Sequence, residues 1–447
     1  MRKLLLLIAL VAFTAGYAHA GDIKRELDSI VSKWEYLEKF SGSVAVLQHG
    51  EVLLNKGYGV SIANTGKVPH ENTLYLIGES TEMFTAALVF KLFEDGKLAL
   101  SDKMTKYIPE LKEYDAVTIK DLLTHRSGIP DYFTSAELGN VYVTHTRTDI
   151  MKIIAGKTLM FTPGTTYNNS FSNYYLLGLI IERITNKPYG EALQQYILKP
   201  LDIKDAGFDF NGLASWDKAQ GHTILSSTRM IPAFNTDSTI GYSAAGLFMS
   251  ANGMYKWAKA ALEYKLLKKS SWQAMTNELG NNYGHGWESR DVFGKKAIGH
   301  TGEIPGFISN FYVIREDSTI IIILSNDFES ETGYIFDQLT AALYKQPYTL
   351  PEKRIPVFLE QHRLEYYAGT YAFEDGSNLN IYIKEGQLWG KMANMNEFTI
   401  VADIIPDEFF MNSVGTEYKF HRDKKTNLVT HVVVRTNRKE SIAKKWQ

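Results

Sequence analysis

One helix-like stretch decides how the rest of the chain is interpreted: Ile77-Gly-Glu-Ser-Thr-Glu-Met-Phe-Thr-Ala-Ala-Leu-Val-Phe-Lys-Leu-Phe-Glu-Asp-Gly96. Its apolar residues Phe84, Leu88 and Leu92 recur every four positions, which predicts a helix with an apolar face. Two acidic residues stand in or near its first turn, where the helix dipole favours negative charge. The sequence therefore predicts a core-facing helix over about Ser80–Phe93, with its first turn directed at a site.

The composition is that of an ordinary globular protein. The chain has 447 residues, of which 45% are hydrophobic and 22% charged, and this length suggests two or three domains. The formal net charge is -2, from 48 basic and 50 acidic residues, so nothing favours nucleic acid or an anionic membrane as a partner. Because the chain contains no Cys, it has neither a disulfide nor a thiol for lipid attachment.

The first twenty residues have the features of a secretory signal. Arg2-Lys3 is followed by an apolar run from Leu4 to Phe13 and by the cleavage signal Ala18-His19-Ala20. We predict a signal peptide over residues 1–20, a mature chain from Gly21, and a periplasmic or secreted protein with no integral membrane segment after cleavage. An uncleaved membrane anchor is the alternative.

The main body predicts an α+β fold, with an antiparallel five-stranded sheet flanked by helices and an all-helical subdomain. Helices 23–40 and 332–344 are expected to cover one face of the sheet, and the helix at Ser80 the other. Residues 238–250 are rich in Gly and Ser and are predicted to be a loop. A ligand groove is expected where the sheet meets the helical subdomain. The predicted strands are Gly42–Gln48, Val52–Tyr58, Lys296–Gly302, Ser309–Ile314 and Ser318–Ser325.

The pattern changes after residue 345. Residues 346–358 contain three prolines and no periodicity, which predicts a linker between a domain over 21–345 and a second domain over 359–447. The second domain shows seven short strand-like runs separated by turns, which indicates a small all-β barrel or sandwich.

Several stretches of the main body match a known family. They are Phe40-Ser-Gly-Ser-Val, Asp121-Leu-Leu-Thr-His-Arg-Ser-Gly-Ile-Pro130, Pro163-Gly164, Leu176-Leu-Gly-Leu-Ile-Ile-Glu182, Tyr283-Gly-His-Gly-Trp287 and Gly299-His-Thr-Gly-Glu-Ile-Pro-Gly-Phe307. With them, residues 41–345 resemble the serine β-lactamase and penicillin-binding-protein superfamily, especially its esterase, D-aminopeptidase and class C-like branch. The tail from about residue 360 resembles the lipocalin-like domain often attached to this branch.

The resemblance implies acyl transfer by a Ser nucleophile and a Lys one turn later, with a Tyr-x-Asn loop, a Lys-Thr-Gly or His-x-Gly strand and an oxyanion hole. In this chain the Ser and Lys positions hold Glu79 and Glu82. The Tyr and Asn positions hold Asn169 and Phe171. Only the strand motif is kept, beginning at His300. Residues predicted to contact a ligand are Ser80, Phe171, Thr301, Gly302 and Glu303.

These replacements favour a non-acylating pseudo-enzyme that keeps the groove and binds a peptide, an amine or a sugar. The alternative is a hydrolase that uses Glu79 and Glu82 as an acid/base or nucleophile pair, with His300 as a third titrating group. Residues i and i+3 of a helix lie roughly 5–6 Å apart, so the two carboxyls should have divergent pKa values. The structural alternative is that Glu79 and Glu82 are simply acidic residues of a first helical turn, where the helix dipole favours negative charge.

Three further interpretations concern Ser80, a metal site and His125. Ser80 as nucleophile would point away from the groove, because one helical step rotates a side chain by about 100°. Glu79, Glu82 and His300 are possible metal ligands, but their spacing is not diagnostic, and we predict no metal and no cofactor. His125 is expected to fasten a loop rather than to react. The oligomeric state and the role of the β domain stay open.

Overall fold

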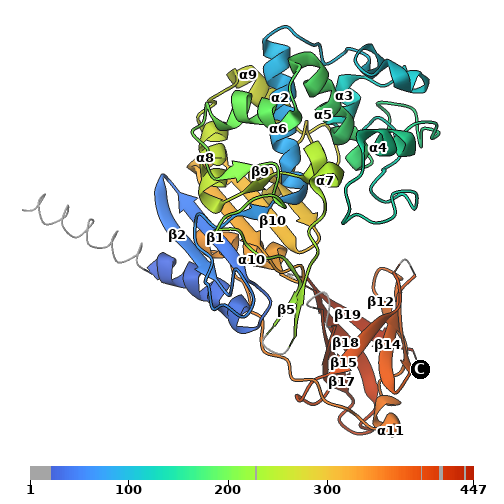
Figure 1. The fold of residues 1–447 in the computed structure, drawn as a ribbon. Helices are drawn as coiled ribbons and strands as arrows, with labels where there is room; N and C mark the ends of the chain where they lie inside the picture. Colours follow the sequence, from blue (N-terminus) through green and yellow to red (C-terminus); the bar gives the residue numbers. More distant parts are fainter. Residues whose placement is uncertain (1–21, 227–228, 394, 412–415, 437–438, 447) are drawn as a thin grey trace, which may run out of the picture. The chain divides into compact units, whose positions relative to one another are not determined.

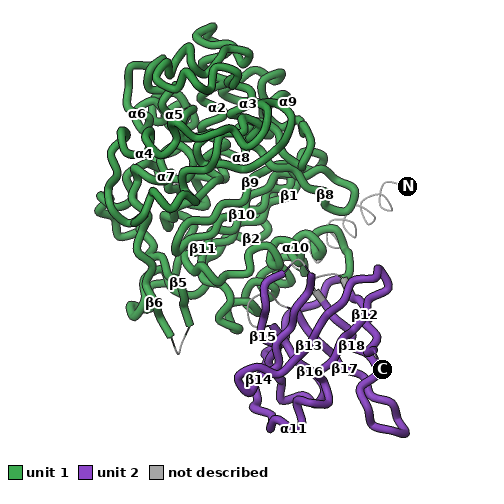
Figure 2. The backbone as a smooth tube through the Cα atoms, turned by 90° about the vertical axis from the view of Figure 1, so that its right-hand side faces the viewer, with its two compact units in different colours: residues 1–347 green, residues 348–447 purple. Residues whose placement is uncertain are grey.

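The computed structural model describes residues 22–446, except for 227–228, 394, 412–415 and 437–438. The chain divides into two compact units, and the division falls after Pro347, inside the predicted linker (Figure 2). Residues 355 and 357 already make backbone hydrogen bonds to the barrel of the second unit, through Ile404 N and Ala402 O. The predicted signal peptide 1–20 lies outside the described residues.

Unit 1 is built on one antiparallel sheet that contains all five predicted strands (Figure 1). The sheet has six strands rather than five, because a short strand, β8 (Glu288–Val292), adds to its edge. Three of its five residues are charged, so the segment lacks the apolar alternation that predicts a strand. The order in the sheet is β2 (Glu51–Tyr58), β1 (Gly42–Gln48), β11 (Thr319–Ser325), β10 (Phe307–Ile314), β9 (Lys295–Ile304) and β8.

Helices cover both faces of this sheet. The helix over residues 22–36 and α10 (Thr332–Leu343) lie on one face, and Trp34 Nε1 donates to Gln338 Oε1 at 2.7 Å between them. On the other face, α8 (Ala251–Leu262) packs against β1, β10 and β11 (Figure 1). Successive residues of β11 alternate between the two faces, and all seven are buried, as expected for a strand covered on both sides.

Helix α2 (Thr81–Glu94) is the predicted central helix, but it is buried on more than one face. Every residue from Thr81 to Phe90 is buried, and Phe84 stacks on Trp257 with ring centroids 4.3 Å apart. A helix that is buried all round belongs to the interior of a large domain. The position of α2 is therefore fixed by packing on all sides, and its first turn is held rigidly.

The remaining helices of unit 1 form the helical subdomain and the layer beside the sheet (Figure 1). Short two-stranded and three-stranded sheets join them to the main sheet. The helices are α3 (Ile119–Leu123), α4 (Arg147–Ile154), α5 (Phe171–Thr185), α6 (Tyr189–Leu193, continued by a π-helical turn over Gln194–Leu198), α7 (Ser238–Ala245) and α9 (Lys269–Thr276); the short strands are β3 (Tyr75–Leu76), β4 (Ala206–Gly207), β5 (His222–Leu225), β6 (Met230–Pro232) and β7 (Phe248–Met249).

The predicted loop over residues 238–250 was wrong, since this segment forms α7 and β7. Asp237 caps α7 by accepting a hydrogen bond from Thr239 N at 2.9 Å, and the helix is broken at Tyr242, whose φ is 36°. The small residues serve close packing: a Cβ on Gly178 of α5 would lie 2.0 Å from Ser243 Oγ. Gly and Ser were therefore signs of a tight helix–helix contact rather than of a loop.

Unit 2 is a closed, antiparallel eight-stranded barrel, which agrees with the expected lipocalin-like domain (Figure 2). Seven of its strands were predicted, and the last strand, which closes the barrel against the first, was missed. Its interior is filled by apolar and aromatic side chains such as Tyr371, Phe409 and Phe420. A short helix, α11 (Gln361–Leu364), precedes the strands β12 (Gly369–Phe373), β13 (Asn378–Lys384), β14 (Gln387–Lys391), β15 (Phe398–Ala402), β16 (Glu408–Phe410), β17 (Glu417–Arg422), β18 (Val429–Thr436) and β19 (Lys439–Lys445).

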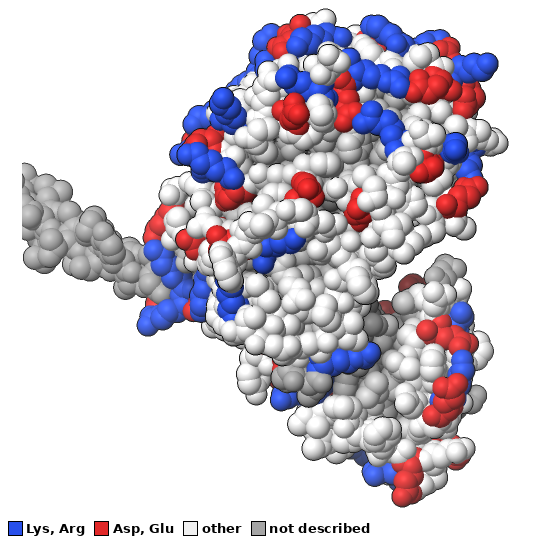
Figure 3. All heavy atoms as spheres, in the orientation of Figure 1, with Lys and Arg blue, Asp and Glu red and all other residues white. Residues whose placement is uncertain are grey.

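Acidic and basic side chains are interspersed on the face of the protein that Figure 3 shows. In the part of the chain that the structure describes, none of the helices has both the length and the apolar character needed to cross a membrane.

Candidate functional site

The candidate site lies where the first turn before α2 meets strand β9. This turn, η1 (Gly78–Ser80), carries Glu79 and runs directly into α2 and Glu82. Gly78 has φ +54°, and a Cβ there would lie 2.6 Å from Glu303 N. The turn therefore needs glycine, which tolerates this conformation and lets the turn approach the strand.

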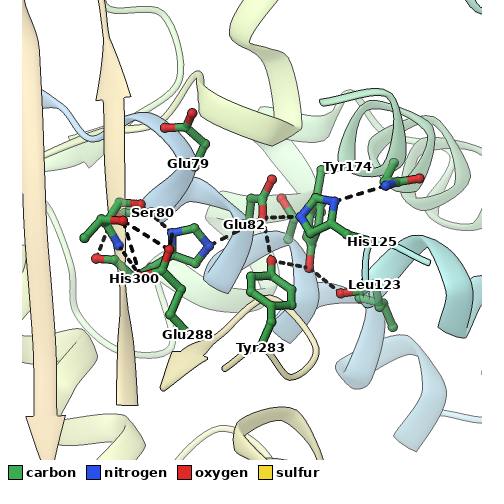
Figure 4. A network of polar contacts seen from close by, with 12 residues as sticks. Glu79, Ser80, Glu82, Leu123, His125, Tyr174, Tyr283, Glu288 and His300 are labelled. Atoms are coloured by element: carbon green, nitrogen blue, oxygen red, sulfur yellow. Dashed lines mark hydrogen bonds and ion pairs between the residues drawn. The ribbon is translucent and has the colours of Figure 1, made fainter. Parts of the chain in front are cut away.

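Glu82 is fully buried among three polar side chains (Figure 4). Its Oε2 accepts a hydrogen bond from Tyr283 Oη at 2.6 Å, lies 3.0 Å from His125 Nε2 and forms an ion pair with His300 Nε2 at 3.5 Å. Burial by itself would raise the Glu82 pKa, but His125 and His300 outweigh it and hold the pKa well below its ordinary value. Glu82 is therefore a buried carboxylate that a ligand does not reach.

His125 links this carboxylate to the start of α5. Its Nδ1 accepts hydrogen bonds from Ser170 N at 3.2 Å and from Asn173 Nδ2 at 3.0 Å. The other end of the Asn173 side chain accepts from Ser127 Oγ at 2.5 Å, which fixes the orientation of the amide. Since Nδ1 is an acceptor, Nε2 carries the hydrogen and donates it to Glu82. His125 thus fastens the loop before α5, as expected, and also orients Glu82.

His300 is buried between two carboxylates (Figure 4). Glu82 contacts its Nε2, and Glu288 Oε1 lies 3.7 Å from its Nδ1. Burial opposes the charged ring, but the negative charges of Glu288 and Glu82 raise the His300 pKa to about 9. His300 is therefore an imidazolium at neutral pH, and its charge balances part of the negative charge of the site.

Glu79 has a different environment from Glu82. It is only partly exposed, and its Oε2 accepts a hydrogen bond from the backbone N–H of Glu303 at 2.6 Å. Burial raises the pKa of Glu79 to about 7 against this hydrogen bond, and the charge of Glu82 adds to the increase. Near neutral pH, Glu79 therefore exists in both protonation states.

The two carboxyls differ in pKa, as their spacing predicts, but the physical causes are not those of a facing pair. Glu79 points away from the cluster around Glu82 in Figure 4. Its pKa is raised chiefly by burial, whereas two histidines lower that of Glu82. The site therefore offers one accessible acid and one enclosed carboxylate rather than two acids on either side of a reacting bond.

Ser80 does not line the site. Its side chain is fully buried and turned toward the sheet, where it bonds Ser309 Oγ at 2.8 Å and His300 O at 3.3 Å. The predicted rotation away from the groove is what the structure shows, and the prediction that Ser80 contacts a ligand does not match its buried position.

The structure does not bring Asn169 and Phe171 into the cluster around Glu82. Asn169 is exposed, and Phe171 stacks on Phe133 with ring centroids 4.6 Å apart. Between them, the Ser170 side chain is buried without a hydrogen-bond partner among the described residues. His125 keeps the loop close, but position 169 has no Tyr hydroxyl and position 171 has no Asn amide, the two groups that the family resemblance implies there.

The strand motif that begins at His300 contributes backbone N–H groups to the site. Thr301 N donates to Glu288 Oε2 at 3.1 Å, and Glu303 N donates to Glu79. Gly302 is buried, and a Cβ there would lie 2.2 Å from Ile77 O. Both N–H groups on this side of β9 are therefore taken by carboxylates, so the predicted edge for an extended peptide is not free in this state.

Two other features bear on ligands. A shallow recess too small for more than a water-sized group lies beside the end of β9. Its lining includes Ile304, Phe208, Phe210 and Thr236, whose buried Oγ1 has no partner among the described residues. Among the residues that the structure describes, no group of three or more His, Cys, Asp or Glu side chains is arranged to hold a metal ion.

Sequence reasoning missed Tyr283 and Glu288 as members of the site and gave His125 only a structural role. Tyr283 lies 201 residues from Glu82 in sequence, so only the fold joins them. The available signal was the presence of His125 and Tyr283 inside motifs that matched the family. Glu288 directly follows one of these motifs, but its position at the start of an unpredicted strand concealed it.

Comparison with known proteins identifies the class to which this fold and site belong. The sequence model of the Beta-lactamase family matches residues 35–345, more than half of the chain. The chain therefore belongs to the Beta-lactamase family.

Its similarity to individual relatives is more distant. The chain is 29% identical to Protein flp of Staphylococcus aureus strain MW2 over 324 residues, which cover 68% of this chain and 63% of flp. The match thus spans less than two thirds of that relative's length. The fold is similar to that of an octameric penicillin-binding protein homologue from Pyrococcus abyssi, with a TM-score of 0.67 and 22% identity over 95% of this chain and all of that one. It is also similar to D-amino acid amidase from Ochrobactrum anthropi SV3, with a TM-score of 0.62 and 20% identity over 72% of this chain and 99% of that one.

Proposed function

We propose that this chain is a non-acylating member of its family that binds a small cationic ligand, an amine, at Glu79. The observation that carries the proposal is the partly exposed Glu79 carboxyl at the position where the family has its nucleophile. The activating Lys position holds Glu82, which is buried and occupied by three side-chain partners. The two hydroxyls next to Glu79 in sequence are both buried: that of Ser80 is turned into the sheet, and that of Thr81 accepts a hydrogen bond from Leu247 N.

The charge of the site supports a cation rather than an anion. Glu79, Glu82, Glu288 and the exposed Glu303 are acidic, and His300 is the cation that faces them. Among the described residues, the ion pairs of Glu82 and Glu288 involve His300 and no Lys or Arg, and His125 contributes a hydrogen bond to Glu82. A site with this surplus of acceptors favours ligands that donate hydrogen bonds and carry positive charge.

The proposal is tested with three probes of the same shape: benzylamine, benzyl alcohol and benzoate. We expect calorimetry or ligand-observed NMR to show that the wild type binds benzylamine more tightly than the alcohol, and benzoate least. Glu79→Gln should weaken benzylamine binding about tenfold. Glu316→Gln is the matched control, because Glu316 is exposed beyond the far end of β10. Equal binding of the three probes, or equal loss in both variants, would contradict the proposal.

Absence of acylation is tested separately. Purified wild type is incubated with a penicillin, and its intact mass is measured. We expect no mass increase. A covalent adduct on Glu79 or Ser80 would overturn the non-acylating part of the proposal.

A hydrolase is the second candidate, and the Glu79 pKa of about 7 is the observation that favours it. A carboxyl with this pKa transfers protons efficiently near neutral pH. Glu82 does not act as its partner on the substrate, since it is enclosed. The test is an ester, peptide and glycoside screen on the wild type beside Glu79→Gln, and a rate that disappears only in the variant would establish this candidate over the first.

Export belongs to the proposal as well, on the basis of the signal-like residues 1–20. N-terminal sequencing of the protein recovered from the periplasm or the medium should begin at Gly21. Recovery with an intact Met1 would reject cleavage.

A further inference from the structure

Tyr167 lies on a loop that is fastened to the site on both sides of this residue. Before it, Gly164 N donates to Arg126 O at 2.8 Å, and directly after it, Asn168 N donates to His125 O at 2.9 Å. The loop therefore holds the Tyr167 side chain in place before a ligand arrives, which reduces the ordering cost of a contact with it.

The ring of Tyr167 lies beside the buried cluster around Glu82. Its centroid is 5.9 Å from that of His125 and 5.5 Å from that of Tyr283, and both of these side chains contact Glu82. Glu82, His125 and Tyr283 are buried, whereas Tyr167 is partly exposed. Of these three rings, that of Tyr167 is therefore the one that a ligand can reach.

The charges around Tyr167 are mainly negative. Burial raises the pKa of its hydroxyl, the charges of Glu82 and Glu288 raise this pKa further, and the charge of Arg126 opposes them. Arg126 itself is directed at a backbone carbonyl, since its Nη2 donates to Leu279 O at 2.8 Å. The phenol therefore stays protonated at neutral pH, and its ring keeps the negative face that attracts a cation.

We propose that Tyr167 determines the ligand class of the site by binding the charged group of an organic ammonium ion through a cation–π contact. The inference rests on the proposed function for the charge of the ligand, but it concerns a side chain on a different element from Glu79. The Glu288 side chain is 27% exposed, so a carboxylate is accessible as well as the ring. An organic ammonium ion suits this combination, because its charge can rest on an aromatic face, whereas Mg²⁺ gives up its water reluctantly.

The test compares the affinities for benzylamine and benzyl alcohol, because their ratio reports the contribution of the positive charge. We expect Tyr167→Leu to lower this ratio about fivefold and Tyr167→Phe to change it less than about twofold, since a cation–π contact needs the ring and not the hydroxyl. Tyr167→Trp should keep or raise the ratio. Tyr36→Leu is the matched control, because the Tyr36 ring is 64% exposed on the helix over residues 22–36, which covers the other face of the sheet.

The same ratio in the wild type and in Tyr167→Leu would overturn the inference. A loss in Tyr167→Phe as large as that in Tyr167→Leu would also overturn it, because the hydroxyl and not the ring would then bind the cation. Tyr167→Met provides a second variant without a ring in case Tyr167→Leu does not fold, and it should show the same loss.

Glu79→Gln, measured with the same two probes, separates this inference from the proposed function. A ratio that falls in Glu79→Gln but not in Tyr167→Leu would support the proposed function and overturn the inference. A ratio that falls only in Tyr167→Leu would support the inference and reject Glu79 as the binding carboxyl. A fall in both variants would support both, and a wild type with no preference for the amine would overturn both.

Discussion

Nε2 of His125 lies 3.0 Å from Oε2 of Glu82, and both side chains are fully excluded from solvent. The pair joins the loop after α3 to the first turn of α2 through a single contact. A buried carboxylate without its partner is costly, because the charge has lost its water and gains nothing in exchange. We therefore expect the contact between His125 and Glu82 to contribute mainly to the free energy of unfolding.

We predict that His125→Phe lowers the free energy of unfolding by about 1.5–3 kcal/mol, the range for losing a hydrogen bond to a charged group. His70→Phe is the matched control, because His70 lies 3.1 Å from Asp217 in a pair that is exposed by more than a third on both sides. An exposed pair contributes at most about 1 kcal/mol. Urea denaturation of both variants measures the difference, and equal losses would contradict the account of Glu82.

Tyr283→Phe should lower the free energy of unfolding by about 1.5–3 kcal/mol, since it removes one hydrogen bond to an ionised group and leaves the ring in place. Tyr142 is a suitable comparison, because its ring is about half exposed. Tyr142→Phe should have an effect close to zero. Thermal unfolding monitored by circular dichroism distinguishes the two outcomes.

The raised pKa of His300 makes part of the stability depend on pH. A group whose pKa is higher in the folded state binds its proton more tightly there, so its contribution is complete below the unfolded value of 6.5 and is lost as pH rises through about 9. The gap in unfolding free energy between the wild type and His300→Gln should therefore narrow from pH 6.5 to above pH 9. A gap that stays constant over this range would show that His300 is not an imidazolium in the folded protein.

Binding of an amine should depend on the ionisation of Glu79. Its pKa of about 7 implies that the carboxylate form increases several-fold between pH 6 and pH 8. Benzylamine stays protonated over this range, so its affinity for the wild type should rise with pH. The Glu79→Gln variant should show a flat profile, and a wild-type profile equally flat would contradict the role of Glu79.

Gly78→Ala should destabilise the protein more than Gly96→Ala. Both glycines have a positive φ, but a Cβ at Gly78 would meet Glu303 N at 2.6 Å, whereas nothing lies within 4 Å of a Cβ at Gly96. Gly96→Ala therefore measures the conformational cost alone, about 1 kcal/mol, and Gly78→Ala adds the clash. Chemical denaturation measures both, and similar values would show that the contact between η1 and β9 relaxes easily.

The sequence predicted the parts of the fold that depend on local pattern. α2, the hairpin β1–β2 and the strands β9 to β11 all carry apolar periodicity, and each was predicted within a few residues. The errors have physical reasons. Three of the five residues of β8 are charged, and Ser243 of α7 packs closely against Gly178 of α5. In both segments, tertiary contacts decide the conformation, and the periodicity of a single sequence carries no information about these contacts.

The same distinction applies to the site. Glu79, Glu82 and His300 were predicted as site residues because of the collinear spacing of the motifs around them. That Glu82 is enclosed and Glu79 bonds Glu303 N could not be predicted, since these contacts join residues more than 40 positions apart. Either Glu79 or Glu82 could have been the acid exposed to solvent. The folded structure decides this, because it sets the direction of each side chain.

The carboxylates along β9 have a consequence for self-association. The part of β9 beyond Gly299 extends past its pairing with β8, and a strand edge with free N–H groups is a template on which a second chain can build a sheet. Glu288 and Glu79 occupy the N–H groups of Thr301 and Glu303. With these two N–H groups occupied by carboxylates, this part of the edge is a poorer template for a strand of a second chain.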